Sequence, residues 1–117
     1  MKTILIVEDI ELNIDLLVQI LEEEYKLIIA RDGSQAVEMA RTHGPDLVLM
    51  DISLPVMDGY EATGMIRKTC PSLPIIGLSA HAMQGDFEKA RAAGCSDYLT
   101  KPVNEDLLLS KLREYLG

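Results

Sequence analysis

Acidic side chains follow two short apolar runs in this chain. Residues 4–7 lead into Glu8 and Asp9, and residues 47–50 lead into Asp51. Short continuous apolar runs are typical of strands that are buried on both faces of a parallel sheet. Ligands bind at the carboxyl ends of such strands, so the three carboxylates are expected to meet in one crevice. Because they repel one another, this arrangement favours a bound cation or proton.

Each acid also has a simpler interpretation. Aspartate is a preferred residue at the N-terminus of a helix, and Glu8 or Asp9 alone would fit a capping or solvent-facing role equally well. The prediction of a cation site therefore depends on all three acids together.

A hydroxyl group and an ammonium group follow two later predicted strands, as Ser79 and Lys101. Together with the acids they form a set suited to phosphoryl transfer. An aspartate such as Asp51 can be the nucleophile, and Mg²⁺ accepts one or two carboxylates while keeping several waters. The ion and the lysine would neutralise the charge of the phosphoryl group, and the serine would donate a hydrogen bond to it.

Alternating strand and helix patterns predict the elements that position these residues. The expected strands cover 3–7, 27–29, 46–50, 74–78 and 98–99, and the expected helices cover 10–23, 34–43, 59–69, 84–93 and 105–116. Ser34 and Asn104 are predicted N-caps, and Gly44 is predicted to end the second helix. Strands joined by single helices indicate right-handed crossovers, hence an α/β fold with a doubly wound five-stranded parallel sheet and five helices.

Length and composition restrict the class of protein. The chain has 117 residues and a net charge of −8, which indicates one domain and argues against a nucleic-acid partner. Cys70 and Cys95 lack the spacing of a metal site and are interpreted as free thiols. We expect neither a signal peptide nor a membrane span, and therefore a cytoplasmic protein.

Four segments together carry a resemblance to a known family: ILIVED, DLVLMDISLPVMDGYEA, PIIGLSAHAM and AGCSDYLTKPV. The chain resembles the receiver domain of two-component response regulators. It is similar to receivers of hybrid kinases and to single-domain receivers of the DivK type. The resemblance implies the flavodoxin-like receiver topology, one receiver domain over residues 1–117, and no output domain.

The resemblance also implies a role for each site residue. Asp51 matches the phosphoacceptor, while Glu8, Asp9 and the backbone carbonyl of Ser53 match the groups that bind Mg²⁺. Ser79 and Lys101 match the groups that bind the phosphoryl oxygens.

Three further positions match a switch and its surroundings. Tyr98 matches an aromatic residue whose rotamer follows the position of Ser79. The Lys101–Pro102 bond matches one that is usually cis in the family. His81 is interpreted as a residue at the rim of the site rather than a catalytic base.

The implied partner is a histidine kinase or a histidine phosphotransfer protein. The signal would leave through a shape change of the 84–116 face, or by onward transfer of the phosphoryl group. Ile10 stands where the family usually has a polar residue. We predict that Ile10 and Ile14 contact the partner, with plain burial as the open alternative.

Rival functions can be compared with the predicted one by the residues that each would need. Aspartate-nucleophile phosphatases need a second acid two residues after the nucleophile, where this chain has Ser53. A flavodoxin-like redox carrier would need a phosphate-binding loop after the first strand, which the sequence lacks. An adaptor that works without phosphorylation stays open, since an intact site does not prove that a kinase exists. The protein itself is expected to be a signalling protein and not an enzyme with a separate substrate.

Overall fold

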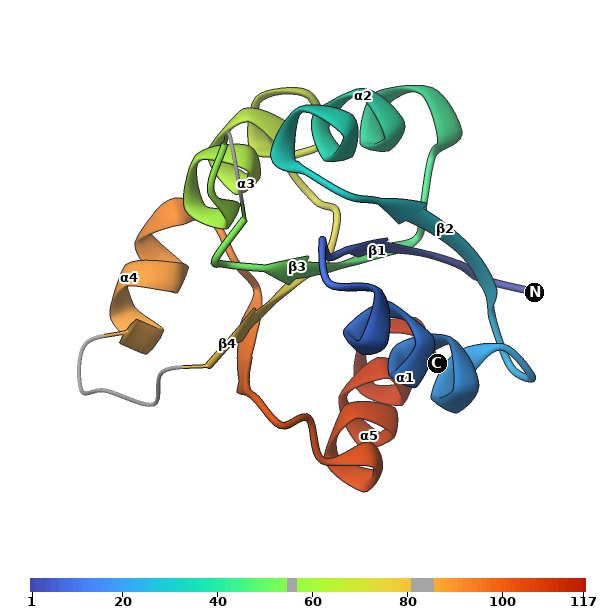
Figure 1. Cartoon of the computed structure of the whole chain (residues 1–117). Coiled ribbons are helices and arrows are strands. Elements are labelled where there is room, and N and C mark those ends of the chain that lie inside the picture. Colours follow the sequence, from blue (N-terminus) through green and yellow to red (C-terminus); the bar gives the residue numbers. More distant parts are fainter. Residues whose placement is uncertain (55–56, 81–85) are drawn as a thin grey trace.

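One parallel sheet forms the centre of the structure, a computed structural model that describes residues 1–54, 57–80 and 86–117. Its strands are β1 (Thr3–Val7), β2 (Lys26–Ala30), β3 (Leu47–Asp51), β4 (Ile75–Ser79) and β5 (Asp97–Thr100). The spatial order is β2-β1-β3-β4-β5, so β1 and β3 are neighbours (Figure 1). In the β1–β3 register Val7 lies opposite Met50. The residues that follow therefore leave the sheet at the same edge.

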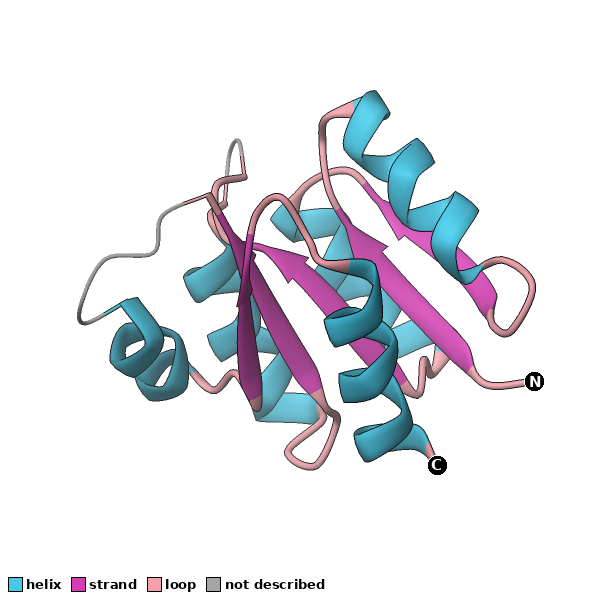
Figure 2. Ribbon diagram, turned by 90° about the horizontal axis from the view of Figure 1, so that it is seen from below, coloured by secondary structure: helices cyan, strands magenta, loops and turns pink. Residues whose placement is uncertain are grey.

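Helices cover both faces of the sheet, as Figure 2 shows. They are α1 (Glu11–Leu21), α2 (Gly33–His43), α3 (Gly59–Thr69), α4 (Asp86–Ala93) and α5 (Glu105–Leu116). Leu17 of α1 and Leu108 of α5 belong to the core on one face, and Ala36 of α2 and Ile66 of α3 belong to the core on the other. The doubly wound fold predicted from the sequence is confirmed. Within the described ranges, no helix has the length and apolar character needed to cross a membrane.

Burial of the strands follows from this layering. All five residues of β3 and of β4 are buried, as are four of the five residues of β1. The edge strands β2 and β5 are more exposed. Strands covered on both faces carry apolar residues at successive positions, which is why these segments contain continuous apolar runs that end at the polar residues Asp51 and Ser79.

Two of the predicted helix caps are confirmed and one is wrong, and α1 is shorter at both ends than the helix predicted over 10–23. Asn104 caps α5 by accepting a hydrogen bond from the Leu107 amide at 2.9 Å. Gly44 ends α2 in the left-handed conformation, with φ of 56°. The predicted cap Ser34 instead lies inside α2, because Asp32 accepts the bond from the Gln35 amide at 2.8 Å. The predicted start of the fourth helix, at residue 84, lies outside the described residues.

Candidate functional site

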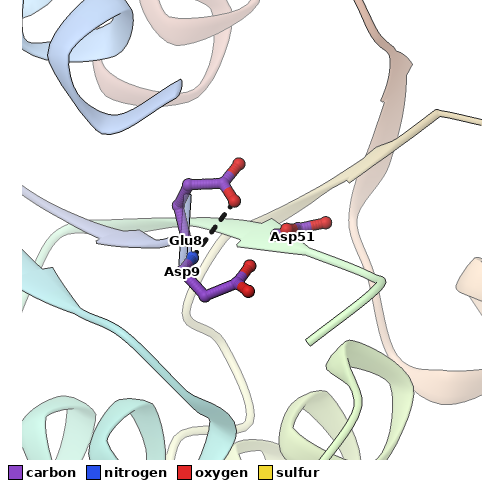
Figure 3. Close-up of side chains that lie close together, drawn as sticks. All are labelled: Glu8, Asp9 and Asp51. Carbon is purple, nitrogen blue, oxygen red and sulfur yellow. Dashed lines mark hydrogen bonds between the residues drawn. The ribbon is translucent and has the colours of Figure 1, made fainter. Parts of the chain in front are cut away.

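The three acids predicted to meet do so at the carboxyl edge of the sheet. Glu8 and Asp9 directly follow β1, and Asp51 ends β3. One oxygen from each carboxylate lies within 4.8 Å of the others (Figure 3). Glu8 and Asp51 are only 1% and 3% exposed, whereas Asp9 is exposed. The site is thus a buried pair of acids with a third acid at its mouth.

Lys101 reaches this pair from the end of β5, the strand at one edge of the sheet. It follows β5, which is separated from β1 by β3 and β4. Its Nζ lies 2.7 Å from Oε1 of Glu8 and 3.4 Å from Oδ2 of Asp51. The other oxygen of Glu8 accepts hydrogen bonds from the amides of Asp9 at 3.1 Å and Ile10 at 3.3 Å. Glu8 is therefore satisfied at both oxygens, which is the condition for burying a charged carboxylate.

Asp51 is held by its own loop. Its Oδ1 accepts a hydrogen bond from the Ser53 amide at 3.0 Å, while Oδ2 faces Lys101. The bond to Ser53 fixes the orientation of the carboxylate. It also places the peptide that follows Asp51, including the Ser53 backbone, beside the acid cluster.

Burial and the neighbouring acid raise the pKa of Asp51 to about 6, from the usual 3.8. A hydrogen bond with Glu8 and the charge of Glu8 add to the effect of burial, and the Ser53 amide and Lys101 oppose it. Burial also acts on Glu8, but hydrogen bonds from Lys101 and with Asp51 bring its pKa below the usual value. One ammonium is thus shared by two buried carboxylates, and the pair still favours an additional positive charge.

Ser79 and Tyr98 lie on the two strands beyond β3. Ser79 is the buried last residue of β4, and its carbonyl accepts a hydrogen bond from the Lys101 amide at 2.7 Å. Tyr98 pairs with Gly77 in the β4–β5 register. Its ring meets Phe87 of α4 edge to face, with ring centres 6.3 Å apart. The strand that carries the predicted hydroxyl group is thus linked to α4 through Tyr98.

Two family-derived expectations have different outcomes here. The Lys101–Pro102 peptide bond is cis, as the resemblance implies. His81 lies outside the described residues.

The predicted contact of Ile14 with a partner is wrong, because Ile14 is only 2% exposed. It shares the inner face of α1 with Leu17 and Leu21, which are also buried. The outer side of this helix and its entry carry exposed apolar residues instead: Ile10 at 53%, Leu12 at 67% and Leu16 at 51%. Leu12 and Leu16 are four residues apart in the sequence, a spacing that fits a buried helix face as well as an exposed one.

A cleft of about 150 Å³ lies next to this exposed face. Leu16 and Ile20 of α1 line one part of it, and Val103 lines another. Glu8 and Lys101 also contribute to its wall. Leu16, one of the exposed apolar residues of α1, therefore lines the same cleft as Glu8 of the acid cluster.

Comparison with known proteins assigns this arrangement to a family. Residues 4–113 match the response regulator receiver domain. The chain belongs to this family. The receiver is 40% identical to the polar-differentiation response regulator DivK of Brucella ovis, over 99% of this chain and 97% of that protein.

Solved receiver structures agree with this assignment. One is the receiver domain of sensor histidine kinase PA1611 from Pseudomonas aeruginosa, which was solved with a magnesium ion coordinated in its active site cleft. Its TM-score with this chain is 0.92 at 40% identity, and the match covers 99% of this chain and 98% of that chain. Another is the receiver domain of Ssk1 from Saccharomyces cerevisiae, which was solved in complex with the histidine phosphotransfer protein Ypd1. Its TM-score is 0.91 at 35% identity, and the match covers 97% of this chain and 88% of that chain. The prediction of a two-component response regulator receiver is confirmed.

Proposed function

We propose that Asp51 accepts a phosphoryl group from a phosphohistidine on a histidine kinase or a histidine phosphotransfer protein. The observation that carries this proposal is the position of Asp51, a buried carboxylate beside Glu8 and Asp9 with the ammonium of Lys101 at 3.4 Å. A nucleophilic carboxylate needs neighbouring positive charge when it approaches an anionic phosphoryl group. The solved complex of the Ssk1 receiver with Ypd1 supports a partner of this kind.

The acid cluster suits Mg²⁺ as a cofactor. We propose that Glu8, Asp9, Asp51 and the backbone carbonyl of Ser53 hold the ion, directly or through water. The donor set fits, because hard carboxylate oxygens within 4.8 Å of one another carry more negative charge than Lys101 offsets. When bound, the ion supplies positive charge that stabilises the transferring phosphoryl group.

The transfer itself exchanges one bond for another. The phosphorus–nitrogen bond of the phosphohistidine breaks, its electron pair stays on the imidazole, and Oδ2 of Asp51 forms the new phosphorus–oxygen bond. Asp51 must be ionised to do this, while the Ser53 amide keeps its other oxygen in place at 3.0 Å. Lys101 then leaves Glu8 for the phosphoryl oxygens, and the Ser79 hydroxyl donates a second bond to them.

These two new contacts are the proposed origin of the switch. Movement of Ser79 would change the rotamer of Tyr98, and Tyr98 touches Phe87 of α4. The 84–116 face would then bind its partner differently, or the phosphoryl group would pass to another histidine. The proposed chemistry is limited to phosphorylation and dephosphorylation of Asp51. We also propose that the protein is cytoplasmic. We propose no nucleic-acid partner, which is consistent with the net charge of −8.

We propose that the histidine partner docks on the exposed apolar residues at the start of α1. Ile10 follows Glu8 and Asp9 directly in the chain, and Leu12 and Leu16 are two further exposed apolar residues of α1. A partner seated there would bring its histidine to the edge of the sheet where Asp51 lies.

Mass spectrometry after incubation with acetyl phosphate and Mg²⁺ tests the assignment of Asp51. The wild type is expected to gain one phosphoryl group, Asp51→Asn none, and the exposed-site control Asp15→Asn the same as wild type. An equal adduct on Asp51→Asn would refute the proposal. The rival adaptor function is tested by partner binding with and without beryllofluoride and Mg²⁺, since an adaptor would bind equally in both conditions.

A further inference from the structure

Gly77 is the third residue of β4 and lies in the interior of the sheet. It is opposite Met50 of β3 on one side and opposite Tyr98 of β5 on the other. Glycine weakens the interior of a strand and often marks a place where another group approaches closely. Unlike Gly44, Gly77 does not have a positive φ, so its backbone would accept alanine. The space around Gly77 is therefore what distinguishes this position.

Three side chains meet where a side chain at position 77 would begin. A Cβ atom built on Gly77 would lie 3.3 Å from Cδ1 of Ile52, 3.4 Å from Sγ of Cys95 and 3.5 Å from Cδ2 of Tyr98. Ile52 directly follows Asp51 in the chain. The ring of Tyr98 thus lies beside the bare Cα of Gly77, next to the residue that follows Asp51.

Ser79 lies on the same face of β4 as Gly77. Side chains two residues apart in a strand point to the same side of the sheet. Ile75 belongs to the core against which Tyr98 packs, whereas Ile76 belongs to the core on the opposite face. Gly77 and Ser79 therefore follow Ile75 on the Tyr98 side of the sheet. A ring that filled the space left by a moving Ser79 would have to pass across Gly77.

The other contact of the ring is with α4. Phe87 meets Tyr98 edge to face, with ring centres 6.3 Å apart, and is itself 43% exposed. A methyl group at position 77 would thus crowd the ring from the side of β4. It would leave the side of Phe87 unchanged, so the added group would favour a ring that stays away from β4.

We propose that Gly77 is a positioning residue for the Tyr98 switch: its missing side chain keeps open the space through which the ring turns toward Ser79 when Asp51 is phosphorylated. This inference rests on the proposed function, because it concerns the same switch. A methyl group at position 77 should oppose the phosphorylated conformation and leave the resting one intact. In the resting protein its closest contact would be the terminal methyl group of Ile52, which can move aside.

Titration with beryllofluoride at saturating Mg²⁺, followed by amide NMR, tests the inference. Beryllofluoride binds a phosphoacceptor aspartate in place of the phosphoryl group. Gly77→Ala is expected to raise its apparent dissociation constant roughly fivefold, within the range by which residues in contact influence one another. The matched control is Gly64→Ala in α3, where an added Cβ would meet nothing within 4 Å. Its dissociation constant should equal that of wild type.

A double-mutant cycle with Tyr98→Ala separates the switch from simple packing. If Gly77 acts through the ring, Gly77→Ala should have no effect on beryllofluoride affinity once the ring has been removed. An equal effect in both backgrounds would overturn the inference, and so would the absence of any effect in the wild-type background. Urea unfolding without beryllofluoride records any change in the stability of the resting protein separately.

If Gly77→Ala does not fold, contacts in the wild type give the answer. Beryllofluoride should change the nuclear Overhauser contact between the α protons of Gly77 and the ring of Tyr98. A contact of unchanged intensity would overturn the inference as well. A wild type that responds to beryllofluoride no more than Asp51→Asn would refute the proposed function itself, whereas equal affinities of wild type and Gly77→Ala would refute only the role of Gly77.

Discussion

Lys101 is held more closely by Glu8 than by Asp51, with 2.7 Å from its Nζ to Oε1 of Glu8 and 3.4 Å to Oδ2 of Asp51. Glu8 is buried, so the ammonium compensates a charge that water cannot reach. The lysine therefore has a structural partner before any phosphoryl group arrives. On phosphorylation it would exchange this partner for the phosphoryl oxygens, which connects the stability of the resting protein to its chemistry.

Replacing Lys101 by methionine should destabilise the protein in a pH-dependent way. Breaking a buried ion pair costs about 3–5 kcal/mol, and the 20% exposure of Lys101 reduces this to about 2 kcal/mol at pH 7. The pKa of Glu8 is lowered in the folded protein, so the stability it contributes is present at neutral pH and is lost as the pH falls through that pKa. Urea unfolding should thus show a large loss at neutral pH and a smaller one near pH 4.

Lys68→Met is the control for this experiment, because Lys68 is exposed on α3. It should change the free energy of unfolding little at either pH. An equal loss for Lys101→Met at both pH values would show that packing, and not charge, is what Lys101 provides.

Mg²⁺ binding should weaken when the pH falls below about 6. The pKa of Asp51 is raised to about 6, so a proton competes with the ion for this carboxylate near neutral pH. One pH unit below that pKa, about a tenth of the protein has Asp51 ionised, and the apparent dissociation constant should rise roughly tenfold. Calorimetric titrations between about pH 5 and 8 measure this directly. An affinity that is flat over this range would contradict the raised pKa.

Asp51→Asn should stabilise the protein at neutral pH in the absence of Mg²⁺. Because the pKa of Asp51 is raised in the folded state, its contribution to stability is full below pH 3.8 and is lost as the pH rises through about 6. Asparagine removes this loss, which is on the order of 2 kcal/mol at pH 7. Urea unfolding should therefore show the gain at pH 7, and the gain should disappear near pH 4. Saturating Mg²⁺ should reduce it too, because the ion stabilises only the wild-type site.

The acid cluster could be predicted from the sequence because it depends only on where strands end. The unbroken apolar runs before Glu8 and Asp51 indicated buried parallel strands, and parallel strands bring their ends to one edge. The pairing of Lys101 with Glu8 could not be predicted in this way. It joins the ends of β1 and β5, which are not neighbours, and it depends on side-chain conformations that strand order does not determine.

The wrong predictions concern the buried side of α1 and the N-cap of α2, neither of which the local sequence pattern determines. Helix α1 carries apolar residues on two sides, so the spacing of Ile14 and that of Leu16 both fit a buried stripe. Only the direction in which the helix enters from β1 decides that Ile14 faces the core and Leu16 does not. Asp32 and Ser34 are likewise both good N-cap residues, and the tertiary structure selects Asp32.

The exposed side chain of Ile10 should matter for phosphotransfer from a protein and not from a small molecule. Ile10 is 53% exposed and occupies the N-cap position of α1 without a side-chain capping bond. Ile10→Asp places a charge in the proposed docking surface, and aspartate is favourable at an N-cap, so the helix should stay intact. A central anchor residue of an interface costs more than about 1 kcal/mol when it is replaced, so transfer from the cognate phosphohistidine protein should slow roughly tenfold.

The rate with acetyl phosphate is the internal control, because this donor needs no docking surface, and it should stay at the wild-type level. Met65→Asp is the matched protein control, since Met65 is an exposed apolar residue on α3, 40% exposed, and α3 covers the opposite face of the sheet from α1. Transfer to Met65→Asp should equal that to wild type. If Ile10→Asp also accepted the phosphoryl group from the histidine protein at the wild-type rate, the partner would have to dock away from the start of α1.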